Sequence, residues 1–123
     1  MNDDSILNRL QSESVENSYH HEGDYKPFGV SRQAVSLNCI FKNGNQQGIA
    51  WGLYTNAQFN PREGITFEFT HMKLTIQGHF LASLYHYVMG NGVTFVAEAD
   101  QATTRLIVSQ QRTVISKLSV ESN

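Results

Sequence analysis

The chain has 123 residues, of which 40% are hydrophobic, and its formal net charge at pH 7 is −2. This length and composition predict one domain with a single hydrophobic core. No apolar run approaches the ~20 residues that a membrane-spanning helix needs, and one cysteine, Cys39, excludes an internal disulfide framework.

The polar, acidic first residues lack the basic and apolar regions of a signal peptide. A lone cysteine fits a reducing compartment. We therefore expect a cytoplasmic protein without a membrane partner.

Charge is unevenly distributed along the chain. Residues 1–33 carry three basic and six acidic side chains, whereas residues 34–98 carry three of each. The central part is therefore well below the ~25% charged content of an ordinary domain. A weakly charged surface favours self-association, so we expect a homo-oligomer, with a protein partner that the sequence leaves unidentified. No basic stripe is present, which disfavours a nucleic-acid partner.

The first third of the chain predicts a flexible segment followed by strands. Residues 1–29 are polar and acidic, and we expect them to be flexible. A compact domain is expected over residues 30–98. Its first strand covers 34–41, where Cys39 falls on the inward side, as is typical of a buried apolar residue rather than a nucleophile.

Two further strands are expected at 49–54 and 55–59, followed by a turn over 60–64 that contains Pro and Gly. Ala50 and Gly52 lie on the outward side of the first of these strands. Because both are small, another chain can approach closely there, and we take them as interface candidates.

A hairpin over residues 64–78 is the strongest structural signal. Apolar residues alternate on odd positions up to Phe69 and then on even positions from Met72. This phase change predicts a tight turn at Thr70 and His71. The resulting register pairs Phe69 with Met72, Phe67 with Leu74, Ile65 with Ile76, Glu68 with Lys73 and Thr66 with Thr75.

The remaining segments are a helix, a strand and a tail. Residues 79–89 have apolar side chains at helical spacing, and a last strand is expected at 93–98. In the tail, residues 99–123, β-branched residues favour strand and the lack of Gly and Pro favours helix, so we expect a weakly helical or extended tail. The whole pattern predicts an α+β fold: one twisted antiparallel sheet of five to six strands, barrel-like if it curls, with one helix packed on it.

The histidines are the residues that suggest chemistry. His71 lies at the hairpin turn, and His79 and His86 lie on the expected helix, two turns or about 10 Å apart, which is too far to share a metal. Together with Tyr54 they are the candidate ligand-binding residues. An acid–base set of His71, His79 and Glu98 requires a fold that brings them together.

The adjacent His20 and His21 lie in a polar segment that we interpret as solvated. The chain contains no GxSxG, Walker, HExxH or CxxC motif. We therefore expect no catalytic residue, no metal and no cofactor.

Three functions remain in order of preference. The first is a non-catalytic module that acts through protein contacts and self-associates. The alternative is a barrel-like domain that binds nucleic acid or a small ligand. The third is a small enzyme that uses His71, His79 or His86.

Overall fold

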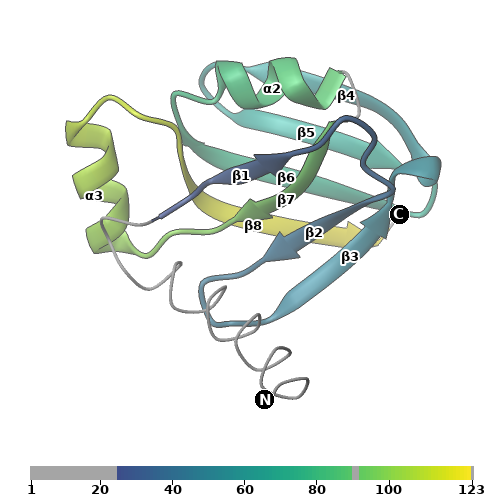
Figure 1. Cartoon of the computed structure of the whole chain (residues 1–123), viewed down its shortest axis with the longest axis horizontal. Coiled ribbons are helices and arrows are strands. Elements are labelled where there is room, and N and C mark those ends of the chain that lie inside the picture. The colour runs from purple at the N-terminus through teal and green to yellow at the C-terminus, as the bar shows by residue number, and fades with distance from the viewer. Residues whose placement is uncertain (1–24, 90–91, 123) are drawn as a thin grey trace.

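The computed structural model describes residues 25–89 and 92–122. These residues form two four-stranded sheets, two α-helices and one 3-10 helix (Figure 1). In spatial order, sheet A consists of β1 (Phe28–Val30), β7 (Val93–Ala97), β2 (Ser36–Ile40) and β3 (Gln46–Ala50). Sheet B consists of β4 (Tyr54–Asn60), β5 (Gly64–Phe69), β6 (Met72–His79) and β8 (Val114–Ser122). The helices are η2 (Trp51–Leu53), α2 (Ala82–Met89) and α3 (Gln101–Ser109).

The α+β class is confirmed, but the single sheet of five to six strands is wrong. The expected strand over 49–54 ends at Ala50, and η2 turns the chain from sheet A into sheet B. The side chain of Trp51 is buried in this turn and donates from Nε1 to the backbone oxygen of Val93, 2.8 Å away. The period-two pattern therefore runs across a corner between two sheets.

The central hairpin has the predicted register. β5 and β6 pair Ile65 with Ile76, and the pairs Thr66–Thr75, Phe67–Leu74 and Glu68–Lys73 follow. The preceding turn also forms as expected, with Glu63 N donating to Asn60 O. Gly64 leaves that turn at φ +104°, where a Cβ atom would collide with the backbone oxygen of Ile76, so glycine is required there.

The hydrophobic core lies between the two sheets. Inward side chains from both sheets and from α2 form one cluster. Its members that are at most 2% exposed include Leu37, Ile49, Ile65, Phe67, Leu74, Ile76, Leu84 and Val88. α2 closes one end of the space between the sheets and contacts both β4 and β7 (Figure 1). Burial of these alternating faces provides the main force that holds the sheets together.

One strand pairing departs from the antiparallel expectation. β2 and β7 are parallel, with Asn38 opposite Phe95 and Ile40 opposite Ala97. β7 also pairs with β1 in antiparallel fashion, so it lies between two strands from the start of the chain. Periodicity identified β7 as a strand but carried no information about its neighbours.

The expected helix over 79–89 begins late, at Ala82. β6 continues to His79, which lies opposite Val114, because a bulge after Gln77 keeps the strand paired with β8. Phe80 then has φ +56° and remains 52% exposed. His79 and His86 therefore do not lie on one helix.

The segment expected as a weakly helical or extended tail contains both kinds of structure. α3 is capped by Asp100, whose side chain accepts from Thr103 N. β8 then completes sheet B as the neighbour of β6, with Val114 and Ile115 fully buried. The expected flexible segment 1–29 lies mostly outside the described residues, but Tyr25 is 1% exposed and belongs to the fold.

Glu98 links the two sheets along the side where β7 ends. Its Oε1 accepts from Lys42 N at 2.9 Å, just after β2, and its Oε2 accepts from Leu118 N at 3.1 Å in β8. Its own backbone N–H donates to Ile40 O. Glu98 is 8% exposed, and both of its carboxylate oxygens accept backbone N–H groups.

Candidate functional site

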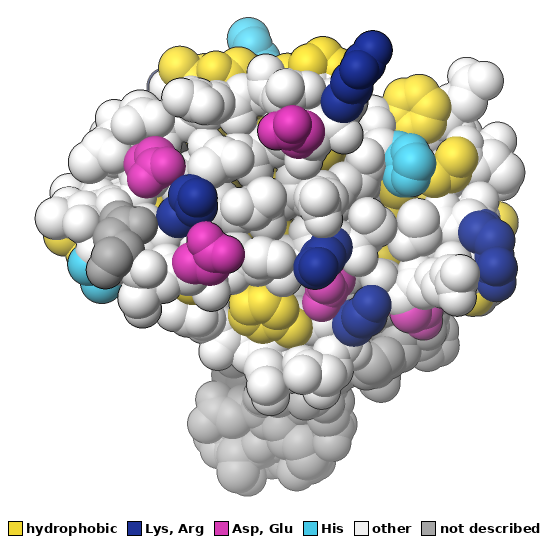
Figure 2. Space-filling view, turned by 180° about the vertical axis from the view of Figure 1, so that it is seen from behind, with side chains coloured by type: hydrophobic (Ala, Val, Ile, Leu, Met, Phe, Trp, Pro, Cys, Tyr) yellow, Lys and Arg dark blue, Asp and Glu magenta, His cyan; other side chains and the backbone are white. Residues whose placement is uncertain are grey.

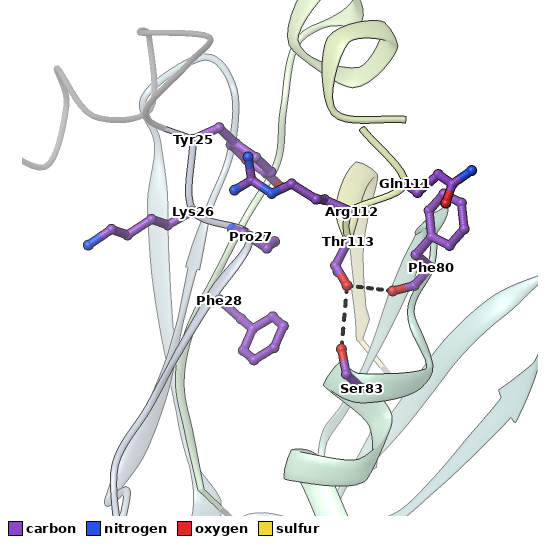
Figure 3. Close-up of a pocket in the computed structure, with 9 residues that line it drawn as sticks. All are labelled: Tyr25, Lys26, Pro27, Phe28, Phe80, Ser83, Gln111, Arg112 and Thr113. Atoms are coloured by element: carbon purple, nitrogen blue, oxygen red, sulfur yellow. Dashed lines mark hydrogen bonds between the residues drawn. The ribbon is translucent and has the colours of Figure 1, made fainter. Parts of the chain in front are cut away.

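A pocket lies where separate parts of the chain meet: the residues that lead into β1, the link from β6 to α2, the first turn of α2 and the loop between α3 and β8 (Figure 3). Its volume is about 520 Å³, within the range of roughly 300–1,000 Å³ that is typical of small-molecule sites. Its lining consists of Tyr25, Lys26, Pro27, Phe28, Phe80, Ser83, Gln111, Arg112 and Thr113. Only the folded chain brings these segments together.

Two hydroxyl groups lie side by side on one wall of the pocket. Thr113 Oγ1 donates to the backbone oxygen of Phe80 at 2.5 Å and lies 3.4 Å from Ser83 Oγ (Figure 3). Because the single hydroxyl hydrogen of Thr113 is directed to Phe80, Ser83 must be the donor within the pair. The Ser83 hydroxyl rotates freely and can donate to a bound ligand instead.

The opposite wall is aromatic. In Figure 3 the ring of Phe28 points into the pocket, beside Pro27. Phe28 is half-buried, and its ring centroid lies 5.8 Å from that of Tyr87 on α2. Phe28 also packs against the main core cluster, so the pocket has a preformed apolar surface.

Two residues of the lining have an unusual backbone. Phe80 has φ +56° and Gln111 has φ +57°, and they are the two non-glycine residues with positive φ among those described. For residues with a Cβ atom this conformation costs about 1–2 kcal/mol. Such conformations concentrate at functional sites, and here both lie in the wall of one pocket.

The two charged side chains of the described lining, Lys26 and Arg112, are both cationic. Arg112 extends across the pocket toward Tyr25 in Figure 3, whereas the side chain of Lys26 points away at the rim. None of the nine lining residues is Asp or Glu. Ser83 belongs to the first turn of α2, so the positive end of that helix dipole also lies at this wall.

The predicted histidine sites are separated by the fold. His71 lies at the turn before β6 and His79 at the last position of β6, so eight residues of extended strand, or about 26 Å, separate them. Glu98 uses both oxygens on backbone N–H groups. The acid–base set of His71, His79 and Glu98 therefore does not assemble.

The other candidates also lie outside the pocket. His86 is exposed on α2, with its ring centroid 6.0 Å from that of Tyr87. Tyr54 packs edge-on against Trp51, with centroids 5.3 Å apart, and burial, followed by repulsion from Tyr85, raises its pKa. The structure thus places Tyr54 in an aromatic cluster at the opposite end of β6 from His79.

The interface candidates Ala50 and Gly52 are both exposed. A Cβ atom added to Gly52 would meet nothing within 4 Å. Close approach by another chain is therefore sterically open at this corner.

Metal ligands do not converge in the described part of the chain: no group of three or more His, Cys, Asp or Glu there could hold an ion. His20 and His21 lie outside the described residues. Cys39 is fully buried, and burial raises its pKa to about 12. A second, smaller cavity of about 270 Å³ is lined by Lys42, Ala99, Gln101, Thr104 and Ser116.

The outer face of sheet B carries no continuous basic path. Figure 2 shows this face, where cationic and anionic side chains are interspersed among uncharged ones. Lys73 pairs across the strands with Glu68 and with Glu121, and its Nζ lies 3.8 Å from Glu121 Oε1. Alternating charges of this kind do not suit a phosphate backbone.

Comparisons of the chain with protein-family models, with curated proteins and with solved structures find no match. No helix among the described residues is long and apolar enough to cross a membrane.

Sequence reasoning missed the residues of the pocket. Phe80 had an expected place on the apolar side of a helix, and Arg112 and Thr113 fell in the tail. One signal was available: Tyr25 to Phe28 is an aromatic and proline-containing stretch at the end of a polar, acidic segment. Such a change in composition is typical of the point at which a folded domain begins.

Proposed function

We propose that this chain is a small ligand-binding domain and that its site is the pocket lined by Phe28, Phe80, Ser83, Arg112 and Thr113. The observation that carries the proposal is the pocket itself, an open hollow of about 520 Å³ with an aromatic side chain on one wall and two hydroxyls opposite it. Concave sites with apolar walls and a few convergent polar groups are the usual form of small-molecule sites.

The composition of the lining supports binding rather than catalysis. The nine residues include no histidine, cysteine or carboxylic acid, which are the common general bases and nucleophile activators. Ser83 and Thr113 bond to each other and to a backbone carbonyl, so neither hydroxyl has a base to activate it. The described lining therefore favours binding over reactions that need a histidine, cysteine or carboxylate.

A fragment screen by protein-observed NMR tests the proposal. Ser83 is exposed on α2 and lines the pocket, so Ser83→Trp should fill the cavity without disturbing the core. Fragments should shift the amide signals of Phe28, Ser83 and Thr113, and Ser83→Trp should abolish these shifts.

The matched control is Ala102→Trp, since Ala102 is exposed on α3 and does not line the pocket. This variant should bind the fragments as the unmodified protein does. Fragments that bind elsewhere, or that bind Ser83→Trp equally well, would refute the site.

Self-association is a second candidate function, and exposed apolar side chains favour it. Tyr87 and Met89 on α2 are 46% and 57% exposed, and Val30 on the neighbouring β1 is 51% exposed. The ring contact between Phe28 and Tyr87 places β1 beside α2. Neighbouring apolar groups of this kind are common at interfaces between subunits.

Native mass spectrometry at physiological salt tests this second candidate. A dimer that dissociates in Tyr87→Ser/Met89→Ser, but not in His71→Ser, would support an interface at α2. A monomer at micromolar concentration would reject it.

A further inference from the structure

We infer, on the basis of the proposed function, that the pocket takes a small organic anion in which a carboxylate or phosphate group is joined to a flat apolar group. The inference rests on the guanidinium of Arg112 and on the lack of acidic side chains in the described lining of the pocket.

The charged side chain of Arg112 is available to a ligand in the pocket. Its guanidinium lies over the pocket in Figure 3, and its one side-chain hydrogen bond to the described residues runs from Nη1 to the neutral Oε1 of Gln110, 2.9 Å away. No described carboxylate forms an ion pair with it. An arginine that a folded protein leaves without an acidic partner retains the planar fork of donors that binds carboxylates and phosphates in two-point fashion.

The wall opposite the guanidinium can complete an oxyanion site. The Ser83 hydroxyl donates only a long 3.4 Å contact to Thr113, so little is lost when it turns to an oxygen of the ligand. The first turn of α2 adds the positive end of a helix dipole. Both features favour negative charge at the same place.

The remaining surface of the pocket favours a flat apolar group in the rest of the ligand. The Phe28 ring faces the pocket, whereas the 52% exposed Phe80 lies at its edge, with its backbone oxygen turned to Thr113 and its ring beside Gln111. Aromatic faces bind flat groups by offset or edge-on stacking. A cation is disfavoured, because Lys26 and Arg112 are both in the lining and no acidic side chain belongs to the described part of it.

The test compares three probes of similar shape: benzoate, phenyl phosphate and the neutral benzamide. Affinities are measured by amide shifts at Ser83 and Thr113 at low salt. We expect at least one anion to bind about tenfold more tightly than benzamide, as a charge-assisted hydrogen bond predicts. Benzoate alone would identify a carboxylate ligand, and phenyl phosphate alone a phosphate ligand.

Arg112→Met should reduce the affinity of the anion to that of benzamide and leave benzamide binding unchanged. The matched control is Arg62→Met, since Arg62 is an exposed arginine in the turn between β4 and β5 and should have no effect. Both variants replace exposed side chains, and thermal melts verify that they fold.

Separate results overturn the inference and the proposed function. Equal binding of benzamide and the anions, or equal effects of Arg112→Met and Arg62→Met, would refute the anion preference and leave the pocket as a site for neutral ligands. If none of the three probes binds while other fragments occupy the pocket, the anion preference is also refuted. If no fragment and no probe shifts the pocket signals, the proposed function itself fails.

Discussion

The carboxylate of Glu98 accepts the backbone N–H of Leu118 at 3.1 Å and so joins the end of β7 in sheet A to β8 in sheet B. The second oxygen accepts from Lys42 N at 2.9 Å. A side chain thus accepts a hydrogen bond from a backbone N–H group that would otherwise be unpaired at the strand edge.

Glu98→Gln should destabilise the protein by about 2–3 kcal/mol, because the amide keeps one acceptor and places an NH₂ group against the other N–H donor. Urea unfolding measures the change. Glu63→Gln is the control, since Glu63 is exposed in a turn, and it should stay within about 0.5 kcal/mol of the unmodified protein. Equal stability of the two variants would contradict the role of Glu98 between the sheets.

Tyr25 makes a second link, through one buried hydroxyl. It donates to Ala97 O at 2.6 Å and accepts from Ile115 N at 3.0 Å. Tyr25→Phe leaves both backbone groups unpaired while preserving the ring, so we expect a loss of roughly 2–4 kcal/mol.

Thermal and urea unfolding of Tyr25→Phe measure this loss, and Tyr87→Phe is the control because Tyr87 is 46% exposed. A Tyr25→Phe variant as stable as the control would mean that water replaces the hydroxyl. Such a result would show that the Tyr25 hydroxyl adds nothing to stability.

The sequence predicted structure well where the determinants are local. The register of β5 and β6 follows from alternation and a single phase change, and both are visible within fifteen residues. The corner at Trp51–Leu53 is different, because the chain changes sheet there without a break in its alternation. The partner of β6 on its other side is β8, about 40 residues later, and periodicity carries no information on such pairings.

The site was harder to predict for the same reason. Phe28, Phe80 and Arg112 come from three segments of the chain, and no spacing relates them. The histidines attracted attention as a residue type, but the fold places His71 and His79 at opposite ends of one strand. Convergence of side chains is a property of topology, which the sequence pattern did not specify.

Because Gln111 has a positive φ, substitution by glycine should change stability in opposite directions at the two adjacent glutamines. Gln111 has φ +57° and follows Gln110, the C-cap of α3, so it occupies the position where glycine is most common. Gln111→Gly removes strain of about 1–2 kcal/mol and costs about 0.5–1 kcal/mol of chain entropy. A net stabilisation of up to about 1 kcal/mol is expected.

Gln110→Gly is the matched control, because Gln110 has an ordinary φ of −91°. The same substitution should there destabilise by about 0.5–1 kcal/mol. Melting temperatures of the two variants provide the measurement. If both variants melt below the unmodified protein, the Gln111 backbone is not strained in solution.

Cys39 gives the protein a specific response to alkaline pH. Burial raises the pKa of its thiol from an ordinary value of 9.0 to about 12. Between these values the unfolded chain releases the proton and the folded chain keeps it, so stability is complete below pH 9 and falls as the pH rises toward 12. The contribution of Cys39 to the loss between about pH 9 and pH 10.5 should be roughly 1.5 kcal/mol.

Urea unfolding of the unmodified protein and of Cys39→Ala across this range isolates the effect, because tyrosines and lysines titrate equally in both. The alanine variant should be less stable at neutral pH, since it leaves a cavity, but its stability should decline less steeply above pH 9. Parallel curves would show that the thiol ionises in the folded state, which requires water to reach the position between β3 and β7 that the Cys39 strand occupies.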